Sequence, residues 1–353
     1  METVTVKASR SYQVEIEGGA LPTLGARLTS LLPRAKQVML VSDSTVAALY
    51  GEIAETSLCG AGLQVHRFVF PSGEASKTPA TLCALWCALA EASLSRTDAI
   101  VALGGGVVGD LSGFAAATYL RGIACYQVPT TLLAMVDSSV GGKTAVDLPA
   151  GKNLCGAFSQ PVGVLCDPQV LKTLPSRVYA DGCAEVIKYG YIGDPTLLKM
   201  LEQPFAEAPE AVIARCVRSK RDVVEADEHD NGARQLLNLG HTGAHAIERL
   251  SNFSISHGEA VAIGMLLAAR GAVVKGLCAP DVPAHVEAML QRYHLPTECP
   301  FDADAMAEAA LSDKKRRGGE ITLVLPRKLG ESVLVPTPVE ELAAFFAAGG
   351  AKA

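Results

Sequence analysis

The chain has 353 residues, of which 49% are apolar, 19% charged and 5% aromatic. This composition supplies a substantial core for one large or two ordinary domains and excludes intrinsic disorder. The formal charge of −6 excludes a globally basic nucleic-acid surface, and the few aromatic residues argue against a stacking platform for single-stranded nucleic acid.

The first half of the chain alternates strand-like and helical patterns. Residues 1–19 alternate apolar and polar side chains like a strand and lack the apolar core of a signal peptide. Helices are expected over 78–94, with Thr78 as the cap and Pro79 at the first helical position, and over 107–118. Further strands are expected at 37–41, 64–70, 99–103, 123–128 and 162–166. This alternation predicts an α/β domain, Rossmann-like, with a mostly parallel sheet covered on both faces.

Beyond residue 175 long helical patterns replace most of the strands. We therefore expect a nucleotide-binding α/β domain over 1–174 and a mostly α-helical domain over 175–353. The expected helices are 176–190, 195–202, 209–227, 233–250, 257–276, 281–293 and 303–313. Strands are expected only at 320–325 and 332–335, and the Ala/Gly-rich residues 344–353 are expected to fray.

The cysteines and the hydropathy pattern bear on the compartment. Ten cysteines are scattered without a C-x-x-C pair, which favours free thiols in a reducing cytoplasm over disulfides. Asp110 and Arg121 interrupt the most apolar region, so we expect no membrane-spanning segment.

A glycine-rich turn follows the strand expected at 99–103. Residues 104–110 read Gly-Gly-Gly-Val-Val-Gly-Asp and fit G-x-G-x-x-G, a pattern that lets backbone amides approach a pyrophosphate. No acidic residue closes a strand about 20 residues later, as a dinucleotide-binding fingerprint requires. Asp43, after an earlier strand, or Glu74 with Lys77 could hold a ribose instead. The alternative is a tight turn that binds nothing.

Metal-ligating side chains occur in three stretches of the helical half. Glu185 and Lys188 are spaced i,i+3, and His241 and His245 are spaced i,i+4. His257 begins a very apolar segment. Two imidazoles and a carboxylate make a plausible catalytic zinc site, although spacing does not choose which two histidines bind. His66, His229, His285 and His294 are interpreted as structural.

Lysines beside glycines suggest a phosphate site. Lys143 and Lys152 each follow a glycine in a predicted loop, where a lysine suits phosphate as a point charge. A P-loop is rejected because Asp137 stands where its first glycine is required. Further candidate cations are Arg121, Lys188, Lys220, Arg234 and the pair Lys314–Lys315.

Seven segments together resemble the 3-dehydroquinate synthase family, whose members catalyse the second step of the shikimate pathway. They are SGEASKT, LGGGVVGDLSGFAAATYLRG, VPTTLLAMVDSSVGGKTAVDLPAGKNLCGAF, LKTLPSRVYADGCAEVIKYG, LNLGHTGAHAIE, SHGEAVAIGM and DKKRRGGEITLVLP. The resemblance covers residues 40–326 in the family's order. The chain departs from the pattern at Ala244, where glycine is usual, and at Asp181–Gly182–Cys183, which replaces a more apolar run.

The resemblance implies a phosphate lyase that uses NAD and a divalent metal, zinc or cobalt. Its substrate would be 3-deoxy-D-arabino-heptulosonate 7-phosphate, converted to 3-dehydroquinate by transient oxidation, β-elimination, re-reduction and aldol cyclisation. It also implies a homodimer in which the partner subunit's Arg121 reaches the site.

The resemblance further implies roles for individual residues. The metal ligands would be Glu185, His241 and His257, with His245 near the reacting hydroxyl. The NAD site would comprise Asp43, Glu74, Lys77, Gly104, Gly105, Gly106, Asp110, Thr130, Thr131, Asp137, Ser138, Lys143, Lys152, Thr173 and Leu174. The phosphate would meet Lys152, Asn153 and Arg121. The carboxylate and hydroxyls would meet Lys143, Lys188, Lys220, Arg234, Asn238 and one lysine of 314–315, taken as Lys314.

Three other functions compete with this one. Another sugar phosphate cyclase, such as 2-deoxy-scyllo-inosose synthase, acts on a substrate without the carboxylate that Arg234 and Asn238 would meet. A metal-dependent polyol dehydrogenase would release NADH and does not need the phosphate-binding lysines. A non-catalytic NAD-binding protein would not need the metal set.

Overall fold

The computed structural model describes residues 1–205, 208–230, 232–311, 316–317 and 319–352. The chain divides into two compact units, one of residues 1–174 and 209–229 and the other of residues 175–208 and 230–353. Residues 209–229, which the sequence analysis places in the second domain, therefore pack with the first unit.

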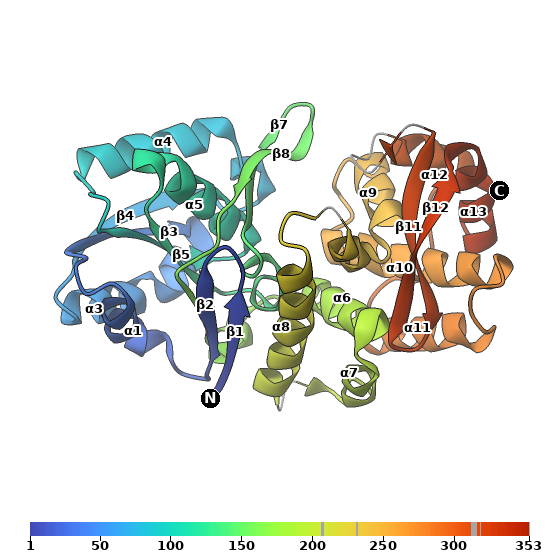
Figure 1. The fold of residues 1–353 in the computed structure, drawn as a ribbon, viewed down its shortest axis with the longest axis horizontal. Coiled ribbons are helices and arrows are strands. Elements are labelled where there is room, and N and C mark those ends of the chain that lie inside the picture. The colour runs from blue at the N-terminus through green and yellow to red at the C-terminus, as the bar shows by residue number, and fades with distance from the viewer. Residues whose placement is uncertain (206–207, 231, 312–315, 318, 353) are drawn as a thin grey trace. The chain divides into compact units, whose positions relative to one another are not determined.

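A seven-stranded sheet forms the centre of the first unit (Figure 1), in the order β1-β2-β9-β6-β5-β3-β4. Its strands are β1 (Glu2–Lys7), β2 (Ser11–Ile16), β3 (Gln37–Asp43), β4 (Gln64–Phe70), β5 (Ala99–Gly104), β6 (Ala124–Pro129) and β9 (Gly163–Cys166). Only the β1–β2 pair is antiparallel, so the predicted parallel sheet is confirmed, and the N-terminal strand pattern is a hairpin of two strands.

Helices cover both faces of this sheet, as predicted. Figure 1 shows α4 (Pro79–Glu91) and α5 (Gly106–Thr118) on one face, with α1 (Leu24–Leu31) and α3 (Glu52–Gly60) on the other. The other helices of this unit are α2 (Ser44–Val46) and α8 (Pro209–Ala226). Its short 3₁₀ or π turns are η1 (Leu21–Thr23), η2 (Ala47–Gly51), η3 (Glu74–Ser76), η4 (Tyr119–Arg121), η5 (Ala134–Ser138) and η6 (Pro168–Thr173). Thr78 caps α4 by accepting from the Thr81 amide, and Pro79 holds its first position.

The segment predicted as a glycine-rich loop is a β-hairpin. Its antiparallel strands β7 (Lys143–Leu148) and β8 (Gly151–Phe158) extend away from the seven-stranded sheet (Figure 1). The sequence pattern hides the hairpin because β8 has no alternation of buried and exposed residues: all eight of its residues are partly or fully exposed. Lys143 and Lys152 thus lie on paired strands.

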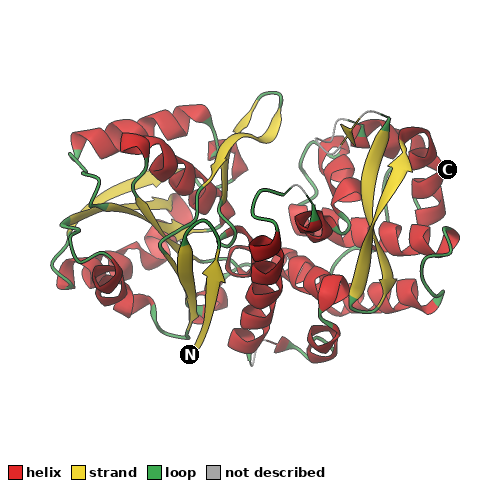
Figure 2. Cartoon of the chain, in the orientation of Figure 1, coloured by secondary structure: helices red, strands yellow, loops and turns green. Residues whose placement is uncertain are grey.

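The second unit is mainly helical and carries a small antiparallel sheet (Figure 2). Its helices are α6 (Ser176–Gly193), α7 (Pro195–Met200), α9 (His241–Leu250), α10 (His257–Val274), α11 (Asp281–Arg292), α12 (Ala303–Ala310) and α13 (Leu342–Gly349). Its remaining elements are η8 (Ala233–Asn238), β10 (Arg316–Arg317), β11 (Glu320–Lys328), β12 (Glu331–Pro338) and η9 (Val339–Glu341).

Two expectations for this unit are wrong. The helix predicted over 233–250 is two elements, because the extended Leu239 ends η8 and Gly240, with a φ of +79°, is the N-cap of α9. The tail predicted to fray contains α13, whose Phe345 and Phe346 side chains are buried. Burial of aromatic surface stabilises a segment whose composition alone suggests fraying.

Helix α10 is the central helix of the second unit. Its length and hydropathy would suffice to cross a membrane, but 72% of that window is buried inside the structure, as in a core helix. Gly264, in the middle of α10, lets the helix approach the start of α9, since a Cβ there would lie 2.1 Å from the Gly240 carbonyl oxygen. This close contact positions the site.

Candidate functional site

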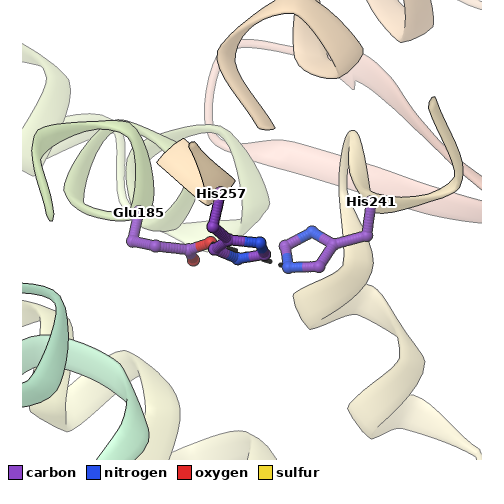
Figure 3. A group of neighbouring side chains, drawn as sticks. All are labelled: Glu185, His241 and His257. Atoms are coloured by element: carbon purple, nitrogen blue, oxygen red, sulfur yellow. Dashed lines mark ion pairs between the residues drawn. The ribbon is translucent and has the colours of Figure 1, made fainter. Parts of the chain in front are cut away.

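Three metal-ligating side chains from separate helices converge in the second unit (Figure 3). Glu185 lies in the middle of α6, whereas His241 and His257 are the first residues of α9 and α10. Oε1 of Glu185 lies 3.6 Å from Nε2 of His241 and 3.4 Å from Nε2 of His257. One ligand atom from each side chain lies within 4.8 Å of the others. The structure therefore groups His241 with His257, while the exposed His245 stands one turn along α9.

The spacing and hydrogen bonding of these donors fit a divalent ion. Donors bound about 2.1 Å from a tetrahedral ion lie about 3.4 Å from one another. Nδ1 of His241 donates to the Leu239 carbonyl at 3.2 Å, which leaves Nε2 as the ligand atom. Two imidazoles and one carboxylate form the donor set of a catalytic site that keeps positions for substrate or water.

The start of α10 is held against α6 by close packing and by capping. A Cβ on Gly258 would lie 2.2 Å from the Asp181 Cα, so only glycine allows this approach. Ser256 and Glu259 form a capping box, and the Ser256 hydroxyl also donates to Asp181 at 2.5 Å. Asp181, one of the departures from the family pattern, thus helps to place His257.

Charges around the cluster are balanced within the second unit. Lys188 pairs with Oε2 of Glu185, and both side chains are buried. Burial by itself lowers the pKa of His257, but Glu185 and Glu248 outweigh it and raise the pKa to about 10. A cation bound here therefore has to displace a proton from His257.

The glycine turn has the predicted strand–turn–helix context in the first unit. Gly104 ends β5, Gly105 is the N-cap of α5 and Gly106 is its first residue. A Cβ on Gly105 would lie 3.1 Å from Thr131 Cγ2, and one on Gly106 would lie 3.2 Å from Ser138 Oγ. The Thr130 amide donates to the Gly104 carbonyl at 2.9 Å. The fold thus brings the glycine turn next to Thr130, Thr131 and Ser138. The turn leads into the N-terminus of α5, whose backbone amides favour binding of an anion.

A buried lysine connects several of the candidate residues in this unit. Nζ of Lys77 donates to Asp110 and to Asn153, both at 2.6 Å, and lies 4.0 Å from Glu74. Burial by itself lowers the pKa of Lys77, but the Asp110 and Glu74 carboxylates outweigh this effect and raise the pKa above its ordinary value. The ammonium therefore stays charged. On α8, Lys220 donates to the Asp137 carbonyl at 2.6 Å and pairs with its carboxylate.

Comparison with known proteins decides the family. The family model for the N-terminal part of 3-dehydroquinate synthase matches residues 67–181, and that for the C-terminal part matches residues 182–316. A 3-dehydroquinate synthase from Pelobacter propionicus is 47% identical over 354 residues, which cover 97% of this chain and 98% of that protein. The chain belongs to the 3-dehydroquinate synthase family.

Two solved structures of sugar phosphate cyclases share this fold. A 2-deoxy-scyllo-inosose synthase complexed with carbaglucose-6-phosphate, NAD+ and Co2+ has a TM-score of 0.88, 27% identity, and covers 98% of this chain and 99% of its own. A 2-epi-5-epi-valiolone synthase from Streptomyces hygroscopicus, with NAD+ and Zn2+ bound, has a TM-score of 0.87, 29% identity and coverage of 98% of both chains. The predicted two-part α/β and helical fold is confirmed.

Several family-site candidates lie outside the two clusters. Asp43 caps α2 by accepting from the Thr45 and Val46 amides, and Thr173 lies 2.6 Å from the Tyr50 hydroxyl. Leu174 follows η6 as its C-cap, and Lys143 is exposed at the start of β7. Arg121 is exposed at the end of η4, more than two helical turns beyond Asp110.

The remaining candidates of the second unit lie on the segment before His241. Arg234 is buried on η8, and Asn238 ends η8 and donates to the Gln235 carbonyl at 3.0 Å. Lys314 and its neighbour Lys315 lie outside the described residues.

The sequence analysis of this 3-dehydroquinate synthase family member missed Glu248. This carboxylate is 5% exposed on α9, and its Oε2 lies 3.6 Å from Nδ1 of His257. A carboxylate at that nitrogen favours the tautomer in which Nε2 binds metal. The available signal was its spacing of seven residues from His241, which places both side chains on the same face of an amphipathic helix.

Replacing Glu248 by glutamine is expected to weaken metal binding by roughly 10- to 100-fold, because the imidazole loses a charged orienting partner. Titration of metal-free protein with Co2+, followed by visible absorption, measures this change. The matched control is Glu308→Gln, which alters an exposed acid of α12 in the same unit. Equal Co2+ affinity in the Glu248 variant and the control would contradict this role.

Proposed function

We propose that this protein is a 3-dehydroquinate synthase that converts 3-deoxy-D-arabino-heptulosonate 7-phosphate into 3-dehydroquinate and phosphate. The observation that carries the proposal is the convergence of Glu185, His241 and His257 in a chain of this family. NAD and a zinc or cobalt ion are its proposed cofactors, as in the two cyclase structures.

Glu185, His241 and His257 would hold the metal, which would polarise the substrate hydroxyl as a Lewis acid. Lys188 forms an ion pair with Glu185, and both side chains are buried. The ring of His245 lies 5.7 Å from that of His241, in T-shaped contact, and is exposed. It is therefore placed to exchange a proton between a bound hydroxyl and solvent.

The first unit would hold NAD, which supplies a reversible hydride acceptor. Gly104, Gly105 and Gly106 would bind the pyrophosphate with Thr130 and Thr131. Asp43, Glu74 and Lys77 would contact the adenosine ribose, and Asp110 and Asp137 would face the nicotinamide side. The cofactor set is completed by Ser138, Lys143, Lys152, Thr173 and Leu174.

Lys152 and Asn153 are the proposed phosphate ligands, together with the partner subunit's Arg121. Arg121 is exposed at the end of η4, beyond the last residue of α5 at Thr118, which makes it accessible to a second copy. A homodimer follows from this proposal. We also propose a cytoplasmic location, because all ten cysteines are free thiols.

The substrate carboxylate and hydroxyls are assigned to cationic and amide side chains. They are Lys143, Lys188, Lys220, Arg234, Asn238 and Lys314. The buried guanidinium of Arg234 is the strongest of these candidates, since it offers a planar fork that matches a carboxylate.

The second candidate function is that of another sugar phosphate cyclase, which the TM-score of 0.88 to an inosose synthase favours. Such an enzyme would have no use for a carboxylate site at Arg234 and Asn238. A polyol dehydrogenase remains the third possibility, and it differs by releasing NADH.

A turnover assay separates these functions. With 3-deoxy-D-arabino-heptulosonate 7-phosphate and catalytic NAD, the protein is expected to release one phosphate per substrate, over many turnovers per NAD, with no steady rise in NADH absorbance. Glucose 6-phosphate, the control substrate without a carboxylate, should react poorly. Stoichiometric NADH would identify a dehydrogenase, and efficient use of glucose 6-phosphate would identify an inosose synthase.

A further inference from the structure

The β7–β8 hairpin contains a bulge at the residues proposed to bind phosphate. Val146 pairs with Cys155 and Leu148 pairs with Gly151, so the single residue Asp147 stands opposite residues 152–154. Extra residues in one strand are pushed out of the ladder and re-aim their side chains. Two of the three bulged residues are Lys152 and Asn153.

The bulge requires an unusual backbone conformation, which a side chain stabilises. Asn153 has a φ of +53°, in the left-handed region that costs a non-glycine residue free energy unless its surroundings hold it there. Oδ1 of Asp147 accepts the Asn153 amide at 2.7 Å. The carboxylate thereby gives a charged acceptor to an amide displaced from regular strand pairing.

The bulge is also tied to the turn that holds Lys77. The Asp147 amide donates to the Lys77 carbonyl at 2.8 Å, and the Lys77 ammonium donates to the Asn153 side chain at 2.6 Å. Asn153 is therefore fixed at its backbone by Asp147 and at its side chain by Lys77. The same ammonium binds Asp110 in the first turns of α5. Lys77 therefore connects the β7–β8 hairpin to the helix that follows the glycine turn.

We propose that Asp147 is a positioning residue for the phosphate end of the substrate. It acts through Lys152 and Asn153 by holding the bulge that presents them. This inference rests on the proposed function, because it takes these two residues as phosphate ligands. It adds a residue that contributes through geometry although its own negative charge opposes phosphate binding.

The negative charge of Asp147 should weaken phosphate binding, whereas its support of the bulge should strengthen it. Two variants separate these effects. Asp147→Asn keeps an oxygen acceptor and removes the charge, whereas Asp147→Ala removes both. A residue that acts only by repelling phosphate would give tighter phosphate binding in both variants. A positioning residue gives weaker binding in the alanine variant and near-parental binding in the asparagine variant.

The experiment measures KM and kcat for the sugar phosphate and the inhibition constant of inorganic phosphate, using the full chain with NAD and metal. In Asp147→Ala, KM and the inhibition constant are expected to rise about tenfold, with kcat changed less than about threefold. Asp147→Asn should stay within about threefold of the parent. Lys152→Ala is the positive control for loss of phosphate affinity, and Glu91→Ala, at an exposed end of α4, is the negative control.

Hydrogen exchange of the Asn153 amide gives a readout that is independent of turnover. It should be faster in Asp147→Ala than in the parent without any ligand, because the amide loses its acceptor. Parental KM, inhibition constant and exchange in that variant would overturn the proposal. If the alanine variant fails to fold, a tenfold loss of phosphate affinity in Asp147→Asn would overturn it, since asparagine retains the acceptor. A parent that binds phosphate but releases none from the sugar phosphate would instead contradict the proposed function.

Discussion

Replacing His257 by alanine is expected to abolish binding of one divalent ion per chain and the activity that depends on it. His257 is one of the three proposed metal ligands, and its Nε2 lies 3.4 Å from the Glu185 carboxylate. Loss of one ligand should weaken the affinity by at least about 100-fold. Metal content after gel filtration, together with zinc or cobalt reactivation of chelator-treated protein, measures the effect.

Proton release provides a second measure of the same prediction. Because the carboxylates raise the pKa of His257 to about 10, the imidazole is protonated at neutral pH in metal-free protein. Cation binding to the parent should therefore release a proton, and the apparent affinity should fall roughly tenfold per unit decrease in pH across the neutral range. The control His294→Asn removes an exposed imidazole from a position with a φ of +57°, which asparagine also tolerates. Full metal occupancy and normal activity in His257→Ala would show that another residue is the ligand.

The substitution Gly258→Ala is expected to destabilise the second unit and to displace His257. Alanine in a helix is ordinarily about 1 kcal/mol more favourable than glycine. Here its Cβ would lie 2.2 Å from the Asp181 Cα and 2.4 Å from the Asp181 carbonyl oxygen, and backbone atoms yield poorly. Overpacking should lower the unfolding free energy by about 2–3 kcal/mol, a fall of roughly 5–10 °C in melting temperature.

The metal site should respond to the same change. Since α10 must move away from α6, His257 shifts relative to Glu185, and Co2+ affinity should fall together with the melting temperature. The matched control is Gly193→Ala at the end of α6, where a Cβ would meet nothing within 4 Å. A melting temperature and a Co2+ affinity equal to those of the control would show that α6 and α10 accommodate the methyl group.

Local patterns in the sequence predicted much of the fold correctly. Strands β3, β4, β5, β6 and β9 of the sheet, the cap and proline of α4, and the glycine turn between β5 and α5 all follow from residues close together in the chain. Periodicity and capping are local properties, so a short window of sequence contains the information. The same reasoning failed for α13 and for the β7–β8 hairpin, whose stability comes from packing or pairing with other segments.

The candidate site divides in the same way. The sequence by itself determined which residue types are available: a carboxylate at 185, imidazoles at 241, 245 and 257, and lysines beside glycines at 143 and 152. Tertiary structure grouped His241 with His257 around Glu185, because α6, α9 and α10 are separate along the chain and bring these residues together only in the folded protein. It also placed Glu248 behind His257 and Asp147 under the bulge of Lys152 and Asn153. Neither placement can be predicted from a linear pattern. Each depends on a contact that forms only when the chain folds, and the spacing of residues along the chain does not determine which side chains touch.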